Sequence, residues 1–177
     1  MYKTHLATSI ALSAALVSTV SYPFTLSYLA GVSLGSLLPD IDEPRSFIGR
    51  RSFGISVIIN RKFGHRGITH SLSMWLVTLI ILLLIIPNPF TLGICLGYIF
   101  HIIGDYFSVS GVPLFYPIDN IRRKSPVTYT TSGKVEKVIY YISVLTSIFL
   151  ITKEKLLTPF VESISELIIN ILRFFIS

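Results

Sequence analysis

The sequence predicts an all-α fold: an integral membrane helical bundle of four to five spans with a C-terminal amphipathic helix. The first observation is composition, because 51% of the 177 residues are hydrophobic and the mean hydropathy is +0.71. The core of a soluble protein of this size does not need such a large fraction of apolar residues. These residues also fall in blocks, which is typical of an integral membrane protein. The second is charge. The net charge of +6 gathers in two loops, which we interpret as positive-inside bias rather than as a nucleic-acid surface.

We expect one domain over residues 1–177, beginning with two helices in 1–38. Pro23 separates two apolar runs there, each shorter than the roughly 20 residues that a lone span needs. A polar, basic loop follows over 39–70, and weakly amphipathic apolar residues within 46–64 predict an interfacial helix.

Helices three and four are expected in 71–109, with the strongest span at 72–86. A second cytoplasmic loop, rich in Pro, Thr and Tyr, covers 110–137. The last part, 138–177, holds a short fifth helix and an amphipathic helix at 156–176, whose apolar residues recur at helical spacing. This pattern leaves open whether the last part spans the membrane or lies on its surface.

The charged loops predict the orientation of the bundle. Six Lys and Arg lie in the first loop and five in the second, whereas the short turns at Pro23 and Asn88 carry none. With helices alternating in direction, both basic loops fall on one side, and the positive-inside rule makes that side cytoplasmic. We therefore expect a multi-pass protein of the inner (cytoplasmic) membrane.

Metal-ligand residues gather at that same face. The chain has only four Asp and four His, and seven of these eight fall at or beside the predicted cytoplasmic ends. Ionisable groups at membrane depth are costly and usually functional. The expected metal ligands are His5, Asp40, Asp42, His70, His101 and Asp105. Mixed His and Asp ligation suits zinc best in this setting, with manganese or iron as alternatives. The set exceeds the four ligands of one zinc, which favours two or three ions.

Each candidate has a simpler explanation when it is taken alone. Asp40 and Asp42 suit turn or helix caps. His101 and Asp105, four residues apart on one helical face, suit a buried structural pair or a proton relay. Only together, at one depth, do these groups favour a metal site.

Three further residues are candidates for catalysis. His65 and Glu136 are each a candidate ligand, ligand-orienting group or general base. Arg66 lies between two histidines and suits bidentate binding of a phosphate oxygen. An equally good explanation is that its side chain extends its positive charge to the membrane surface. The pattern G-x-S-x-G at 31–35 resembles a nucleophile motif. It lies in an apolar helix, so small-residue packing explains it better, as it does for Gly93 and Gly97.

Several motifs together resemble the YdjM-like family of small bacterial inner-membrane proteins, described as LexA-regulated metal-dependent hydrolases. They are His5, LLPDID (37–42), FGHRGITHS (63–71), GYIFHIIGD (97–105), GVPLFYP (111–117) and Glu136 after a Gly/Ser turn. The resemblance implies metal-dependent hydrolysis, a relation to zinc-dependent phospholipase C and single-strand nucleases, and a place in the DNA damage response.

The function expected from these observations is cleavage of a phosphoester by a metal-activated water, on a membrane lipid or another membrane-surface substrate. The alternative is a non-enzymatic membrane protein that uses the same cluster to bind or transport a metal ion or protons. We expect the bilayer and such a substrate as partners and no nucleic acid. The sequence does not indicate an oligomeric state.

Overall fold

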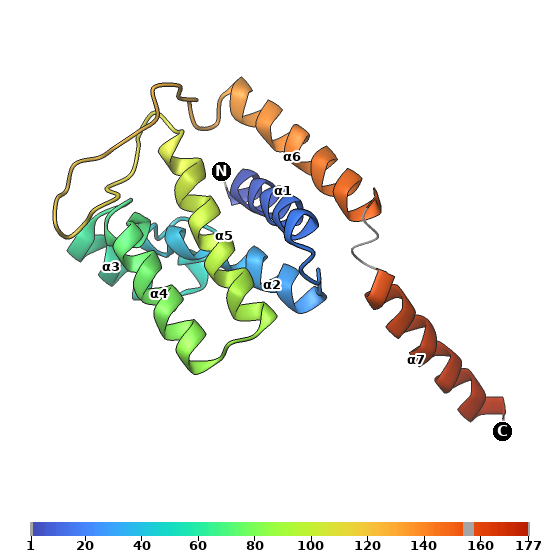
Figure 1. Cartoon of the computed structure of the whole chain (residues 1–177). Coiled ribbons are helices and arrows are strands. Elements are labelled where there is room, and N and C mark those ends of the chain that lie inside the picture. Colours follow the sequence, from blue (N-terminus) through green and yellow to red (C-terminus); the bar gives the residue numbers. More distant parts are fainter. Residues whose placement is uncertain (1, 154–157, 177) are drawn as a thin grey trace.

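The part of the chain that the computed structural model describes is residues 2–153 and 158–176, and it consists of helices joined by loops, the longest of them over residues 107–133 (Figure 1). That part contains no strand, only two isolated β-bridges in the second loop. The prediction of an all-α fold is therefore confirmed. The α-helices are α1 (Tyr2–Val20), α2 (Leu26–Gly35), α3 (Ile55–Phe63), α4 (Leu72–Ile85), α5 (Pro89–Tyr106), α6 (Lys134–Lys153) and α7 (Thr158–Ile176), and three short 3-10 turns are η1 (Leu38–Asp42), η2 (Gly49–Arg51) and η3 (Ile68–His70).

Side-chain caps set where three of these helices begin. Thr25 caps α2, and its Oγ1 accepts the Tyr28 N–H at 3.1 Å. Ser71 does the same for α4. Asn88 and Thr91 form a reciprocal capping box at the start of α5, where Pro89 needs no hydrogen-bond acceptor. These caps place the first turns of α4 and α5 at defined residues.

Close backbone contact fixes the position of α2 against α5. A Cβ added at Gly31 would lie 2.0 Å from the carbonyl oxygen of Phe90, and one at Gly97 would lie 2.2 Å from that of Val32. No other residue fits at such positions, because the obstructing atoms are backbone. Packing by small residues is thus confirmed for this helix pair, and the G-x-S-x-G stretch lies inside α2.

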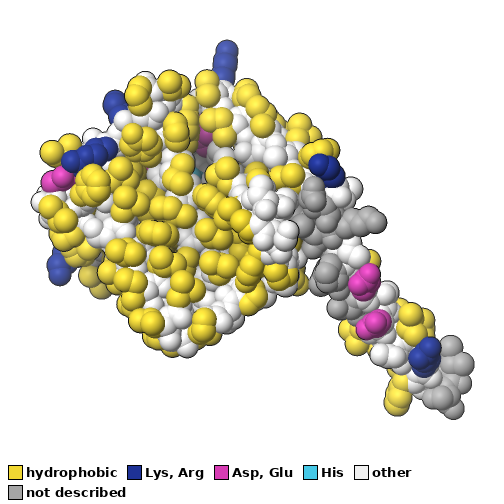
Figure 2. All heavy atoms as spheres, viewed as in Figure 1, with side chains coloured by type: hydrophobic (Ala, Val, Ile, Leu, Met, Phe, Trp, Pro, Cys, Tyr) yellow, Lys and Arg dark blue, Asp and Glu magenta, His cyan; other side chains and the backbone are white. Residues whose placement is uncertain are grey.

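The bundle has more apolar side chains outside than within. Ser9, Ser13 and Thr91 are buried, whereas α4 has no buried residue at all. Figure 2 shows hydrophobic side chains over most of one face of the bundle, with Lys and Arg side chains at its edges. A contiguous apolar exterior of this kind suits a protein surrounded by lipid.

Length and hydropathy alone single out one spanning helix among the described residues. That helix is α6, which packs along α1. The span expected to be strongest, 72–86, is the shorter apolar helix α4, with 14 residues. The number of four to five spans therefore stays a prediction. Helix α7 lies away from the bundle in Figure 1. It begins at Thr158, so residues 156–157 of the predicted amphipathic helix lie outside the described part.

Candidate metal centre

Four separate elements bring the six predicted ligands to one place. They are the first turn of α1 (His5), η1 (Asp40 and Asp42), η3 (His70) and the last turns of α5 (His101 and Asp105). All are buried except Asp40, whose side chain is 14% exposed. The convergence predicted from the loop topology is therefore present, with its most accessible point at Asp40.

Nε2 of His70 and Nε2 of His101 both lie close to carboxylate oxygens of Asp40 and Asp105. Oδ2 of Asp105 lies 3.3 Å from Nε2 of His70 and 3.6 Å from Nε2 of His101. Oδ1 of Asp40 lies 3.8 Å from each of the same two nitrogens. Tetrahedral zinc with N and O ligands at about 2.0–2.2 Å has ligand atoms about 3.3–3.6 Å apart. Asp40, His70 and His101 therefore form a group with spacing suited to a metal ion.

Three of these atoms have no hydrogen-bond partner among the described residues. They are Nε2 of His70, Nε2 of His101 and Oδ2 of Asp105, and all three are buried. A buried polar atom without a partner typically costs about 1–3 kcal/mol. Three such atoms aimed at one point fit a cation, which would satisfy them together. The residues present thus fit a divalent metal with His and Asp ligands.

His5 and His101 form a second possible ligand group with Asp105. Nε2 of His5 lies 3.3 Å from Oδ1 of Asp105, and its ring stacks on that of His101 with centroids 3.9 Å apart. The two groups share His101, and a neutral imidazole has one lone-pair nitrogen, which binds one ion. The expectation of two or three ions therefore stays a prediction.

The packing of α2 on α5 orients His101. Nδ1 of His101 lies 2.6 Å from the carbonyl oxygen of Ser36, at the end of α2. Because a carbonyl only accepts, Nδ1 carries the proton, and Nε2 is left as the lone-pair nitrogen that faces the centre. The glycine contacts between the two helices therefore determine which nitrogen can bind a metal.

Asp42 lies behind His70 and outside both ligand groups. Its Oδ2 accepts hydrogen bonds from the Arg66 N–H at 2.9 Å and the Thr69 hydroxyl at 2.6 Å, and lies 3.1 Å from Nδ1 of His70. Burial alone would raise the pKa of the Asp42 carboxyl, but hydrogen bonds from His65, His70 and Thr69 hold that pKa below its ordinary value. Asp42 is therefore an anion that orients His70.

Asp42 contacts both histidines of the first loop, His65 and His70. Burial alone would lower the pKa of His70, but its contacts with Asp105 and Asp42 raise that pKa to about 9 in the protein without metal. The side chain of His70 is buried, whereas that of His65 is 41% exposed. Its Nδ1 lies 2.9 Å from Oδ1 of Asp42, which leaves Nε2 on the solvent side.

Arg66 contributes its charge inside the site. Its side chain is buried, one guanidinium nitrogen donates to Oδ1 of Asp105 at 2.6 Å, and the other donates to Oγ of Ser108 at 2.6 Å. Its backbone adopts a positive φ of 55°, which is uncommon for a residue other than glycine. Arg66 thus neutralises one oxygen of Asp105 and leaves the other directed at the centre.

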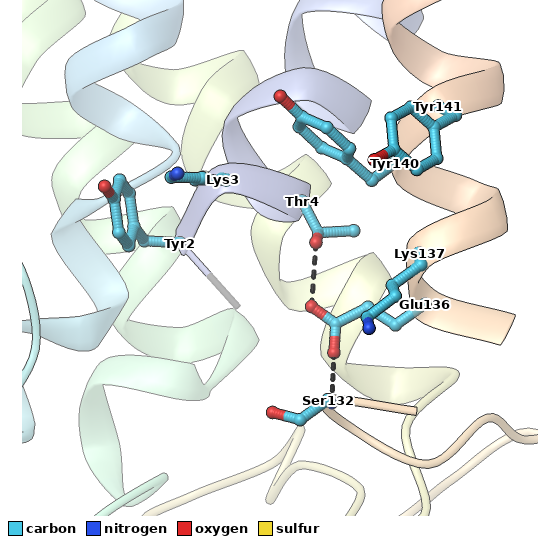
Figure 3. A pocket seen from close by; sticks show the side chains of 8 residues that line it. All are labelled: Tyr2, Lys3, Thr4, Ser132, Glu136, Lys137, Tyr140 and Tyr141. Atoms are coloured by element: carbon cyan, nitrogen blue, oxygen red, sulfur yellow. Dashed lines mark hydrogen bonds between the residues drawn. The ribbon is translucent and has the colours of Figure 1, made fainter. Parts of the chain in front are cut away.

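Glu136 supports the start of α1. Figure 3 shows it reaching from α6 to Thr4 and to Ser132. The Thr4 hydroxyl donates to Oε1 at 2.7 Å, and the backbone N–H of Ser132 donates to Oε2. Because Thr4 precedes His5, these contacts fix the turn that carries His5. Glu136 is in neither ligand group.

Sequence reasoning missed three groups that hold the site. Thr69 donates to Asp42, Ser108 accepts from Arg66, and the Ser36 carbonyl accepts from His101. Thr69 lies inside the G-I-T-H segment next to His70, so its position was a usable signal. The Ser36 carbonyl could not be identified from the sequence, because every residue type has a backbone carbonyl.

Comparison with known proteins gives consistent relatives. The family model described as YdjM inner membrane protein matches residues 1–172. The Inner membrane protein YdjM of Escherichia coli (strain K12) is 44% identical over 90 residues, which cover 48% of this chain and 46% of that protein. The Uncharacterized protein YvsG of Bacillus subtilis (strain 168) is 32% identical over 138 residues, or 77% of this chain and 85% of that protein.

The match to the Escherichia coli relative, like that to the same-named protein of Shigella flexneri, spans about half the length of those proteins. No solved structure matches the chain.

Proposed function

Because the chain belongs to the family of YdjM inner membrane proteins, we propose that it is a membrane-bound, metal-dependent hydrolase that cleaves a phosphoester. The substrate is a lipid or another phosphoester at the membrane surface. The bundle crosses the inner membrane four to five times and turns its metal centre toward the cytoplasm. The positive-inside bias of the two loops supports this orientation.

One observation carries the proposal. Three buried ligand atoms, on His70, His101 and Asp105, have no hydrogen-bond partner among the described residues, and Oδ1 of Asp40 lies 3.8 Å from both histidine nitrogens. Structural polar networks normally satisfy their own members, so three unsatisfied atoms at one point favour a bound ion. Zinc suits the mixed nitrogen and oxygen ligands best, with manganese or iron as alternatives.

A divalent ion held at this centre would lower the pKa of a bound water and stabilise negative charge on a phosphoryl oxygen. The residues around it have separate tasks. His70 and His101 would bind the ion through Nε2, and their Nδ1 atoms are held by Asp42 and Ser36. Arg66 keeps Oδ1 of Asp105 occupied.

Proton transfer is assigned to His65. Its Nδ1 contacts Asp42, and its half-exposed ring can take a proton at Nε2 from the attacking water and return it to the leaving oxygen. Hydrolysis then consumes one water and yields an alcohol and a phosphate group. The pairing of a buried aspartate with a more exposed histidine is a common arrangement for a general base.

The proposal is tested by metal content. Detergent-purified protein should hold at least one equivalent of metal by elemental analysis, and His101→Gln and Asp105→Asn should each lose most of it. Asp119→Asn is the matched control, because Asp119 pairs with Arg123 in the second loop. An unchanged metal-to-protein ratio in folded His101→Gln protein would refute the site.

The near-complete burial of the ligands also supports the alternative, in which the cluster binds or passes an ion without catalysis. Chelator-sensitive turnover of phosphate esters or phospholipids supports the hydrolase. Flux of metal or protons into proteoliposomes, without such turnover, supports transport.

A further inference from the structure

A small cavity opens beside the most exposed ligand of the metal centre. It has a volume of about 250 Å³. The residues that line it are Tyr2, Asp40, Glu43, Arg45, Ser46, Phe47, Arg50 and His65. Ligand pockets for drug-sized molecules are usually about 300–1,000 Å³. The cavity therefore suits a headgroup-sized fragment rather than a whole lipid.

Two arginines, Arg45 and Arg50, balance the two carboxylates, Asp40 and Glu43, that line the same cavity. Arg45 and Arg50 are both exposed, and neither guanidinium takes part in an ion pair recorded for the described residues. The carboxyl of Glu43 accepts the backbone N–H of Arg45 at 3.1 Å rather than a side-chain nitrogen. Both guanidinium groups can therefore bind an anion such as a carboxylate or a phosphate.

The loop that carries the arginines is fixed to the metal centre. Ser46 Oγ donates to the carbonyl oxygen of Asp40 at 2.8 Å and accepts the Gly49 N–H at 2.8 Å. A Cβ at Gly49 would lie 2.0 Å from the carbonyl oxygen of Glu43, so only glycine fits there. The backbones of Arg45 and Arg50 therefore keep a constant position relative to Asp40, so that little backbone freedom is lost on binding.

We infer that this cavity is the phosphoryl-binding subsite of the metal centre, in which Arg45 and Arg50 hold the non-bridging oxygens of the substrate beside Asp40 and His65. The inference rests on the proposed function. Two separate guanidinium groups suit a tetrahedral phosphoryl group, which offers several oxygens in different directions, better than a planar carboxylate. Acyl chains of a lipid substrate would stay outside the cavity.

The surroundings bring the subsite near a lipid surface. Phe53, three residues beyond Arg50, is fully exposed, and Ile55 and Ile58 on the adjoining α3 are also exposed. Asn60 of α3 donates to the Asp42 carbonyl oxygen at 2.7 Å, which ties this apolar edge to the metal loop. Exposed aromatic and aliphatic side chains beside basic residues suit the headgroup region of a membrane.

The experiment measures binding of inorganic phosphate to metal-loaded protein in detergent, by titration calorimetry after free metal has been removed. The double variant Arg45→Gln/Arg50→Gln should weaken phosphate binding by about 100-fold, because each of the two lost charge-assisted contacts costs about tenfold. Arg61→Gln is the matched control. Arg61 is exposed on α3, so its substitution removes the same kind of charge. This variant should change phosphate binding by less than about twofold.

Metal content, measured on the same samples, separates the two proposals. If the double variant keeps its metal and binds phosphate as tightly as the unmodified protein, the subsite is refuted and the metal centre stands. Unmodified protein that holds metal but binds no phosphate also refutes the subsite. Unmodified protein that holds no metal refutes the proposed function itself.

A competition arm distinguishes the two sources of the phosphoryl group. Unmodified protein is placed in nanodiscs of phosphatidylcholine, with or without about one-tenth phosphatidic acid, and titrated with inorganic phosphate. Suppression by phosphatidic acid supports a lipid-borne phosphoryl group. Equal binding in both nanodiscs supports a soluble phosphoester held by the same two arginines.

Discussion

Replacing Asp42 by Asn tests whether that carboxylate orients the metal centre without binding the metal. The substitution keeps the shape of the side chain and removes its charge. An Asn amide oxygen on the Oδ2 side can still accept from the Arg66 N–H and the Thr69 hydroxyl. Its NH2 group would then face His65 Nδ1, which can change tautomer to accept.

The expected cost follows from these contacts. Hydrogen bonds to a charged acceptor contribute about 1.5–3 kcal/mol and neutral ones about 0.5–1.5, so each retained contact weakens by about 1 kcal/mol. With three contacts retained at Oδ2, the free energy of unfolding should fall by about 2–3 kcal/mol. Removing the charge of this orienting partner should also lower metal affinity, and mutation of such partners typically lowers it by about 10–100-fold.

Both quantities are measurable on the purified protein. The chain has a single tryptophan, Trp75, whose indole N–H donates from α4 to the Cys95 carbonyl oxygen in α5 at 2.9 Å. Its fluorescence reports thermal unfolding in detergent, where about 2–3 kcal/mol corresponds to a lower Tm by roughly 4–12 °C. Competition with a fluorescent zinc chelator gives the metal affinity. Asp119→Asn, in an exposed ion pair, should leave both values unchanged.

Two results would refute the reasoning. Asp42→Asn protein that binds zinc within about twofold of the unmodified protein would show that the carboxylate does not orient His70. A complete loss of metal in folded protein, as in Asp105→Asn, would instead make Asp42 a ligand. If Asp42→Asn does not fold, Thr69→Val removes only one contact to the same carboxylate and should lower zinc affinity by less than tenfold.

Three further outcomes are expected. Gly97→Ala should lower metal content and Tm together, because the added Cβ would push α2 away and break the contact from His101 to Ser36. Gly133→Ala is the control. Its Cβ would lie 2.8 Å from the Thr130 carbonyl oxygen in the second loop, and this variant should keep the metal. Glu136→Gln should keep the metal and, if Glu136 only supports α1, should change kcat by less than about threefold; a loss of about 100-fold or more would make it a general base. With metal removed by chelation, the Asp42–His70 pair should stabilise the fold most between about pH 4 and 6.5. That contribution should be lost as the pH falls through the depressed pKa of Asp42 and as it rises through the His70 pKa of about 9; thermal unfolding from pH 3 to 10 checks both limits, and a flat profile would contradict the pairing.

The sequence was sufficient for features that depend on the properties of single residues and short segments. The all-α class, most helix positions and the convergence of His5, Asp40, His70, His101 and Asp105 followed from hydropathy, helical spacing and loop charge. Each residue contributes to these independently, through its own solvation and backbone preference. The packing role of Gly97 was predictable for the same reason.

The tertiary structure decided which atoms face the centre. Asp40 and Asp42 are two residues apart and equal as sequence candidates, yet one points at His70 Nε2 and the other holds Nδ1 of the same ring. The partner of Arg66, the tautomer of His101 and the cavity beside Asp40 likewise depend on how α2 meets α5 and how the loop folds over them. Such contacts join residues up to 65 positions apart, and no local pattern encodes a distance between segments that meet only when the chain folds.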